Sequence, residues 1–151
     1  MAASVARTST DFKPEVPRTH GLHIWINSHT SYWMGEVVLP DWDMFQSGLE
    51  GGASTFHAAA RAISGGPVYC TDECGKEDFD ILRKLSLSDG TIPLCCGYAR
   101  LCRDSLFVDP GTDCKPVKIF NTNPAGSGVI GVFNCCWQEG GNRKVQGTVS
   151  P

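Results

Sequence analysis

The chain has 151 residues, 41% of them hydrophobic and 19% charged, a composition that supports a folded core and excludes a disordered protein. Its net charge of −3 argues against binding a nucleic-acid backbone, which selects basic surfaces. No stretch approaches the roughly 18 consecutive apolar residues of a membrane-spanning helix, and residues 1–17 lack the apolar run of a secretory signal. We therefore expect a cytoplasmic protein with neither nucleic-acid nor membrane partners.

The first half of the chain predicts alternating helices and strands. The first helix rests on apolar residues at helical spacing, Leu22, Ile26 and Trp33. Ser54 or Thr55 is the expected cap of the second helix. Such alternation is typical of a parallel α/β sheet. The expected helices cover residues 19–34, 56–64 and 77–87, and the expected strands cover residues 36–39, which Pro40 ends, and 67–71.

The second half has a different character. Short β-rich runs separated by turn signals predict antiparallel strands at residues 105–109, 117–121 and 129–135. Two or three parallel strands make an incomplete sheet, because exposed parallel edges are unstable alone. The chain either borrows strands from a partner, for example as a homo-oligomer, or is a piece of something larger, and the second alternative is favoured.

The eight cysteines do not follow the spacing of a zinc site. Structural zinc sites pair ligands two to four residues apart and then repeat the pair, whereas Cys70 and Cys74 form one such pair without a second. A disulfide framework is typical of short secreted chains. Reduced thiols are therefore the expected state, and we expect no metal and no cofactor.

Carboxylates follow both predicted parallel strands, Asp41 and Asp43 after the first and Asp72 and Glu73 after the second. The carboxyl ends of parallel strands form the active face of α/β folds, although a single Asp there more often caps a helix. Trp42 offers a ring on which a sugar could stack. If the strand continues, its period of two sends Asp41 and Asp43 to the same side.

Two further features, an arginine–aspartate pair and a histidine, bear on the chemistry. Arg7 precedes Asp11 by four residues, which places a cation near a carboxylate early in the chain. His57 falls on the second predicted helix, where a histidine without a second histidine at i+4 more often packs or caps than binds a metal.

Long segments resemble the seed-imbibition and raffinose-synthase branch of glycoside hydrolase family 36. The resemblance begins near Arg7, ends near Asn134 and is most specific in two motifs. These motifs are Pro40-Asp41-Trp42-Asp43-Met44-Phe45-Gln46-Ser47 and His57-Ala58-Ala59-Ala60-Arg61-Ala62-Ile63-Ser64-Gly65-Gly66-Pro67-Val68-Tyr69.

The resemblance implies the last strands and helices of a (β/α)8 barrel at residues 1–92 and the start of an antiparallel β-sandwich at residues 93–151. It implies action on α-galactosides, as a glycosidase or as a galactosyltransferase of the galactinol and sucrose type. Arg7 and Asp11 match the family's R-x-x-x-D acid/base motif. Asp11 is thus the candidate catalytic acid/base, and the candidate substrate-binding residues are Arg7, Asp41, Trp42 and Asp43.

The family's nucleophilic aspartate lies on an earlier strand in a K-x-D motif, and this chain has no such earlier segment. A retaining mechanism needs two carboxylates, so we expect the chain alone to have little activity. The alternatives left open are a non-catalytic sugar-binding or assembly module and an inactive fragment.

Overall fold

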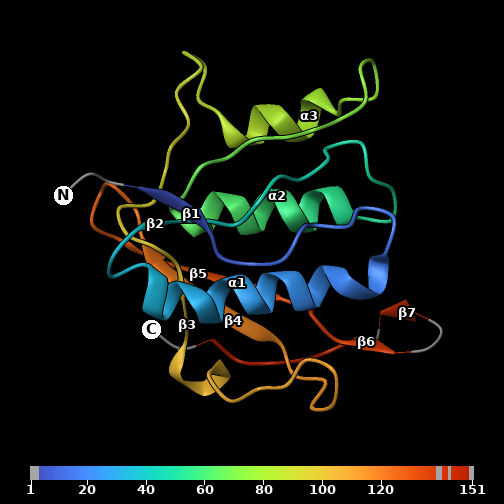
Figure 1. The fold of residues 1–151 in the computed structure, drawn as a ribbon, viewed down its shortest axis with the longest axis vertical. Coiled ribbons are helices and arrows are strands. Elements are labelled where there is room, and N and C mark those ends of the chain that lie inside the picture. Colours follow the sequence, from blue (N-terminus) through green and yellow to red (C-terminus); the bar gives the residue numbers. More distant parts are fainter. Residues whose placement is uncertain (1–3, 139–140, 143, 150–151) are drawn as a thin grey trace.

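The protein is described here by a computed structural model that covers residues 4–138, 141–142 and 144–149. Two parallel strands alternate with helices in its first half, and antiparallel strands follow in its second half (Figure 1). The first half contains β1 (Val5–Arg7), η1 (Pro17–Thr19), α1 (His20–Met34), β2 (Leu39–Asp41), α2 (Ala53–Ser64), α3 (Phe79–Leu82) and η2 (Arg83–Leu85). The second half contains β3 (Arg100–Leu101), η3 (Arg103–Ser105), β4 (Val117–Thr122), β5 (Gly128–Phe133), β6 (Trp137–Gln138) and β7 (Gly141–Asn142).

Strands β1 and β2 pair in parallel, as the alternation predicts, and a parallel bridge joins Phe45 to Cys70. The strand β2 begins later than expected and contains Pro40 instead of ending before it. This is possible because alternate residues of a strand face opposite neighbours. Leu39 N donates to Ser4 O and Thr8 N donates to Asp41 O, so the proline nitrogen points away from β1 and breaks no ladder bond.

The helix α1 agrees with the predicted span, but the prediction chose the wrong residues for its buried face. Leu22 and Trp33 are 45% and 81% exposed. The buried side instead consists mostly of small and polar residues, which approach the neighbouring elements closely and form hydrogen bonds to them. A Cβ on Gly21, for example, would lie 2.5 Å from Cys135 O. The buried residues of α1 are His20, Gly21, His23, Ile24, Asn27, Ser28 and Ser31.

The ends of α2 are set by glycines. Gly52 is the N-cap in a left-handed conformation, and no side chain caps the helix, so the capping predicted for Ser54 or Thr55 is wrong because both lie inside it. Gly65, at a φ of 78°, ends the helix as predicted. A Cβ there would lie 1.8 Å from Gly97 O, so the close contact with the segment at Gly97 also requires glycine.

The third predicted helix is shorter than expected, and consists of α3 followed by the 3-10 turn η2. Asp78 caps it by accepting hydrogen bonds from Asp80 N and Ile81 N. The predicted strand at 67–71 is reduced to the single bridge at Cys70.

The strands β3, β4 and β5 form an antiparallel sheet in that order. The predictions at 117–121 and 129–135 identify β4 and β5, with small differences at the ends. The strand predicted at 105–109 is wrong, since a 3-10 turn occupies its start. Phe107 is 90% exposed and Val108 is buried, so this apolar run folds as a loop without a partner strand.

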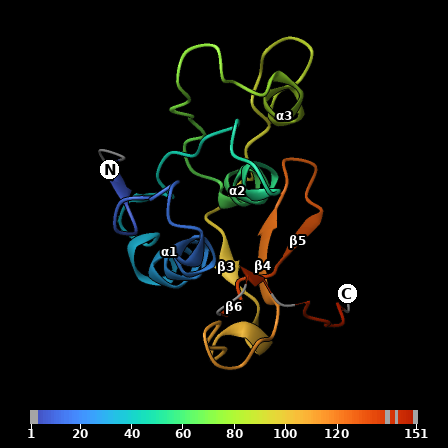
Figure 2. The same cartoon turned by 90° about the vertical axis from the view of Figure 1, so that its right-hand side faces the viewer.

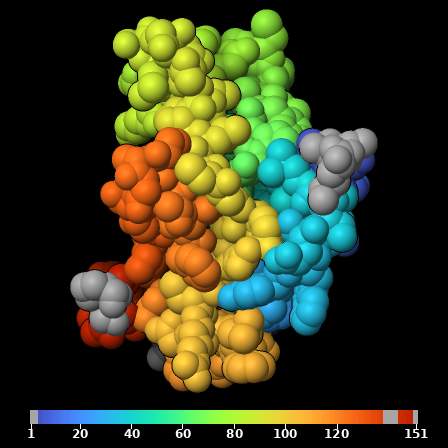
Figure 3. All heavy atoms as spheres, turned by 90° about the vertical axis from the view of Figure 1, so that its left-hand side faces the viewer, coloured from blue at the N-terminus to red at the C-terminus, as the bar shows by residue number. Residues whose placement is uncertain are grey.

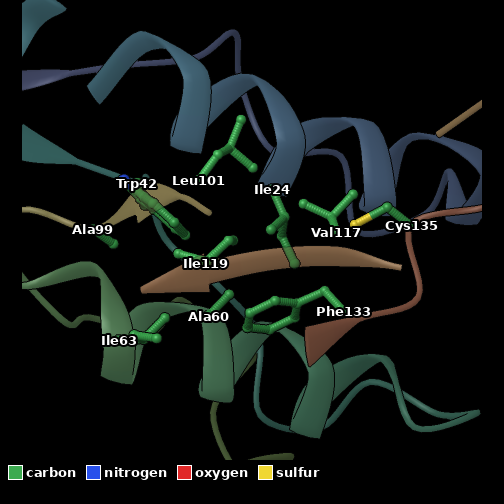
Figure 4. Close-up of a cluster of buried hydrophobic side chains, with 10 residues drawn as sticks. All are labelled: Ile24, Trp42, Ala60, Ile63, Ala99, Leu101, Val117, Ile119, Phe133 and Cys135. Atoms are coloured by element: carbon green, nitrogen blue, oxygen red, sulfur yellow. The ribbon is translucent and has the colours of Figure 1, made fainter. Parts of the chain in front are cut away.

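The α1–α2 layer lies between the parallel strands and the antiparallel sheet (Figure 2). The apolar core fills the space between these helices and the antiparallel sheet (Figure 4). On one face of the molecule, the segment near residue 100 runs between the two halves of the chain (Figure 3). The core residues are Ile24, Trp42, Ala60, Ile63, Ala99, Leu101, Val117, Ile119, Phe133 and Cys135.

A disulfide joins Cys114 to Cys136, so the expectation of reduced thiols is wrong for this pair. It ties the loop before β4 to the segment after β5. Burial raises the pKa of the Cys135 thiol, which is free, to about 12. Within the described residues, no helix is both long and apolar enough to cross a membrane.

Candidate active site at the ends of the parallel strands

Arg7 and Asp41 end the two parallel strands and lie opposite each other in register. Thr8, the next residue, turns toward α1, where its Oγ1 donates to Asn27 Oδ1 at 2.5 Å. Because successive side chains alternate between faces, Arg7 and Asp41 lie on the face away from the helices. This open face of the strands is where polar groups from separate segments meet.

Arg7 links two carboxylates. Its Nη1 lies 2.5 Å from Asp11 Oδ1 and 3.7 Å from Asp43 Oδ2. The Asp11 side chain is 73% exposed and the Arg7 side chain 45% exposed. Both groups are thus accessible to a ligand, and the structure brings the predicted acid/base candidate together with Asp43.

Asp41 is held by two donors. Its Oδ1 accepts from Asp43 N at 2.8 Å and its Oδ2 accepts from the Tyr69 hydroxyl at 3.0 Å. Burial and this hydrogen bond to Asp41 raise the pKa of Tyr69 to about 12, so the hydroxyl remains a donor at neutral pH. Tyr69 was not among the predicted site residues, because it lies inside the predicted strand at 67–71 and not after its end.

Asp43 reaches the site through a turn, not through strand periodicity. Its φ of 65° is left-handed, a conformation that costs a non-glycine residue about 1–3 kcal/mol. Its Oδ2 accepts from Phe12 N at 2.8 Å and its Oδ1 accepts from Met44 N at 2.9 Å. The side chain is 9% exposed, which makes it the least accessible of the predicted carboxylates.

A buried arginine on α2 supports this turn. Arg61 is 0% exposed, and it donates from Nε to Asp43 O at 3.2 Å and from Nη2 to Met44 O at 2.9 Å. Its Nη1 lies 2.8 Å from His57 Nδ1, and Nη2 lies 3.2 Å from His23 Nε2. Arg61 of the second quoted motif therefore holds the backbone of the first one, and His57 of the same motif contacts Arg61.

The histidines beside Arg61 are neutral at pH 7. Burial, together with the smaller effect of the Arg61 charge, lowers the pKa of His23 to about 4. The same two causes lower the pKa of His57 strongly. A neutral His57 whose Nδ1 accepts from Arg61 carries its proton on Nε2, a buried nitrogen that has no hydrogen-bond partner in the described structure. His57 thus packs and accepts a hydrogen bond within the core.

Trp42 does not offer the expected stacking surface. It is 0% exposed, and its Nε1 donates to Ser31 Oγ at 3.1 Å. Trp42 directly follows Asp41, so strand alternation sends its ring toward the helices while Asp41 faces the open side. The substrate-binding role of Trp42 stays a prediction, and in this structure its ring packs inside the molecule and not on the open face.

The other acidic residues near the strand ends have structural partners. Asp72 Oδ1 accepts from Gly48 N at 2.8 Å and Oδ2 accepts from Ser47 Oγ at 2.9 Å. A literal K-x-D triplet occurs at residues 76–78, but Asp78 is the cap of α3. The carboxylate of Asp78 therefore caps the N-terminus of α3. Among the described residues, no group of three or more His, Cys, Asp or Glu is placed to hold a metal ion.

Comparison with known proteins agrees with the resemblance seen in the motifs. The family model described as raffinose synthase or seed imbibition protein Sip1 matches residues 1–146. The chain is 52% identical over 118 residues, 76% of its length, to probable galactinol–sucrose galactosyltransferase 4 of Arabidopsis thaliana. It is 53% identical over 116 residues to a galactinol–sucrose galactosyltransferase of Oryza sativa subsp. japonica, and 49% identical over 116 residues to stachyose synthase of Pisum sativum, again 76% of its length.

These matches cover only 13% to 14% of the relatives' own length. Residues 1–146, which the family model matches, contain the strand ends, the turn at Asp43 and the helix that carries Arg61. The chain belongs to the raffinose synthase and seed imbibition protein family.

Proposed function

We propose that this chain provides the acid/base half of a site that processes α-galactosides by a retaining mechanism. The observation that carries the proposal is the meeting of Arg7, Asp11 and Asp41 on the open face of two parallel strands, at their carboxyl ends. The Asp11 side chain is exposed, so a substrate can reach it, and the Arg7 guanidinium lies beside it.

In this proposal Asp11 acts twice. A carboxylate nucleophile from another segment attacks the anomeric carbon of an α-galactoside, the glycosidic C–O bond breaks, and the Asp11 carboxyl gives its proton to the leaving oxygen. Asp11, now a carboxylate, then takes a proton from the acceptor hydroxyl as that oxygen attacks the galactosyl–enzyme. The acceptor is water in a hydrolase and a sugar hydroxyl, such as one of sucrose, in a transferase.

The neighbouring groups on the open face are suited to hold the sugar. The guanidinium of Arg7 and the carboxylate of Asp41 are a donor and an acceptor for sugar hydroxyls, and Tyr69 keeps Asp41 in place. The relatives' names include galactinol and sucrose, which favours galactinol as donor and sucrose as acceptor. We propose a cytoplasmic location for this carbohydrate chemistry.

The open face also favours the proposed fold class, the last strands of a (β/α)8 barrel followed by the start of a β-sandwich. Helices cover one face of β1 and β2, while Val5 and Leu39 on the other face are 49% and 37% exposed. Parallel sheets are normally covered on both faces. Further strands, from a longer family chain or from a second copy, would complete this part of the structure and bring the nucleophile opposite Asp11.

A hybrid enzyme tests the proposal. In the hybrid, residues 1–146 of this chain, which the family model matches, replace the corresponding segment of the rice galactinol–sucrose galactosyltransferase. Raffinose formation from galactinol and sucrose is then measured. We expect the hybrid to be active and its Asp11→Asn variant to lose about 10²–10⁴-fold in turnover, the range supplied by positioned general acid/base groups. The isolated chain should show little turnover.

The matched control is Asp80→Asn, which removes an exposed carboxylate that also pairs with an arginine. It should leave turnover of the hybrid unchanged. An active hybrid that keeps its full rate as Asp11→Asn contradicts the proposal. Binding of galactose to the isolated chain that survives Asp11→Asn, with no activity in any hybrid, favours a non-catalytic sugar-binding module.

A further inference from the structure

We propose that Asp43 is a positioning residue for Asp11, not a sugar ligand, and that the buried Arg61 holds Asp43 in the conformation this role requires. The inference rests on the proposed acid/base function of Asp11. The inference gives a role to the turn at Asp43 and to the buried Arg61, neither of which takes part in the proposed reaction.

The position of Asp11 depends on the backbone that carries it. Its carboxylate forms an ion pair with Arg7, and its side chain is 73% exposed. Such an exposed side chain has little packing to fix it. The segment after it is held at Phe12, which is buried, and by His20 Nε2, which lies within 3.3 Å of the carbonyl oxygens of Lys13 and Pro14.

Asp43 contacts both groups that fix the position of Asp11, the backbone at Phe12 and the guanidinium of Arg7. Its Oδ2 accepts from Phe12 N, the amide directly after Asp11, at 2.8 Å. The same oxygen lies 3.7 Å from Arg7 Nη1, the group that pairs with Asp11. One nearly buried carboxylate therefore holds the backbone of the acid/base and orients its ionic partner.

Arg61 makes the turn at Asp43 possible. A left-handed φ at a non-glycine residue persists only where the surroundings hold it. Two donors of Arg61 hold the carbonyl oxygens of Asp43 and Met44, and Asp41 Oδ1 accepts from Asp43 N. Both sides of the strained residue are thus fixed by side chains from neighbouring elements.

The environment of Asp43 favours positioning over sugar contact. Both of its oxygens accept backbone N–H groups, and its side chain is 9% exposed. A carboxylate that binds sugar hydroxyls directly needs accessible acceptor sites. Asp41, on the open face, fits that description better than Asp43 does.

Two variants separate the carboxylate from the backbone conformation. Asp43→Gly removes the carboxylate and permits the left-handed φ. Asp43→Asn also tolerates this φ but has a single acceptor oxygen, so either Phe12 N or Met44 N loses its partner. The matched control is Asp72→Ala, because Asp72 also accepts a backbone N–H, that of Gly48, in a loop outside the site.

The first readout is NMR on the isolated chain, which does not depend on activity. In Asp43→Gly we expect the Phe12 amide to exchange at least about tenfold faster and residues 9–12 to lose order on the ps–ns timescale. Asp43→Asn should shift the Phe12 or Met44 amide, and Asp72→Ala should leave Phe12 unchanged. A Phe12 amide that keeps its wild-type shift and exchange in Asp43→Gly overturns the inference.

The second readout is the kinetics of the hybrid enzyme. A misplaced acid/base should lower kcat about 100-fold in Asp43→Gly, with KM unchanged, whereas loss of a sugar ligand should raise KM. A tenfold rise in KM with kcat retained overturns the positioning role. If residues 9–12 loosen but Asp11→Asn leaves the hybrid fully active, the proposed acid/base function fails and the measured coupling of Asp43 to Phe12 stands.

Discussion

The two sides of the α1–α2 layer differ in kind. Toward the antiparallel sheet, the helices present apolar residues such as Ile24 and Ile63 to a core of Val117, Ile119 and Phe133. Toward the parallel strands they present polar side chains with specific partners: Asn27 to Thr8, and Arg61 to the turn at Asp43. The apolar side supplies burial, which is non-directional. The polar side fixes one geometry, because each buried polar group needs a particular partner.

The candidate site lies on the polar side of the α1–α2 layer. The acid/base candidate and its neighbours lie on the strands that the polar side of the layer holds, and the stability of the antiparallel unit comes from the other side. Changes on the polar side should therefore disturb both stability and site geometry, whereas changes on the apolar side should affect stability alone.

The largest expected effect is at Arg61. Arg61→Met leaves the carbonyl oxygens of Asp43 and Met44 unpaired and should lower the free energy of unfolding by about 4 kcal/mol, since each buried polar group left unsatisfied costs about 1–3 kcal/mol. Urea denaturation followed by circular dichroism measures it. The control is Arg83→Met, in an exposed ion pair with Asp80, which should cost about 0.5 kcal/mol or less. Equal effects of the two variants would refute the structural role of Arg61.

A somewhat smaller effect is expected on the apolar side. Ile119 is fully buried, so Ile119→Ala should cost about 3 kcal/mol through lost burial and a cavity. Ile130 on the adjacent strand is 41% exposed, and Ile130→Ala should cost about 1 kcal/mol or less. In contrast to Arg61→Met, Ile119→Ala should leave the Phe12 amide shift unchanged. A changed Phe12 shift would mean that the two sides of the layer are coupled.

The smallest of these effects is the pH dependence of stability. The pKa of His23 is about 4 in the folded protein and 6.5 when unfolded, so the unfolded state binds more protons between these values. Stability is therefore fully present above pH 6.5 and falls as the pH drops toward 4. At about 1.4 kcal/mol per pH unit, His23 alone removes about 2 kcal/mol between pH 6.5 and 5.

His20 and His57, whose pKa values are also lowered, act in the same direction as His23. The His23→Gln variant should show a shallower pH dependence of the unfolding free energy than the wild type. Equal stability of the wild type at pH 7 and pH 5 would contradict the buried neutral state of these histidines.

Sequence patterns predicted the apolar side of this layer better than the polar side. Alternation and turn residues identified β4 and β5, and Gly65 identified the end of α2, because burial and backbone conformation leave a local signal. The buried face of α1 was missed, since hydrophobic periodicity weighs Leu22 and Trp33 and ignores Asn27 and Ser31. The burial of Trp42 did have a local signal that was not used, since alternation after Asp41 places Trp42 on the opposite face, toward the helices.

Within the site, the strand-end positions and the family resemblance together selected Arg7, Asp11, Asp41 and Asp43, and these four lie near one another in the structure. The contact between Asp43 and Phe12 joins residues 31 positions apart, and no local pattern records it. Tyr69 lies 28 positions from Asp41 and was missed for the same reason.

The most direct test of the central claim, that Asp11 is the acid/base, is the dependence of the hybrid enzyme on its leaving group. Aryl α-galactosides with poor and good leaving groups are compared in the wild type and in Asp11→Ala. Proton donation matters most for a poor leaving group, so Asp11→Ala should lower turnover about 100-fold or more for the poor one and less than about tenfold for the good one. An equal loss with both substrates would contradict the assignment of Asp11.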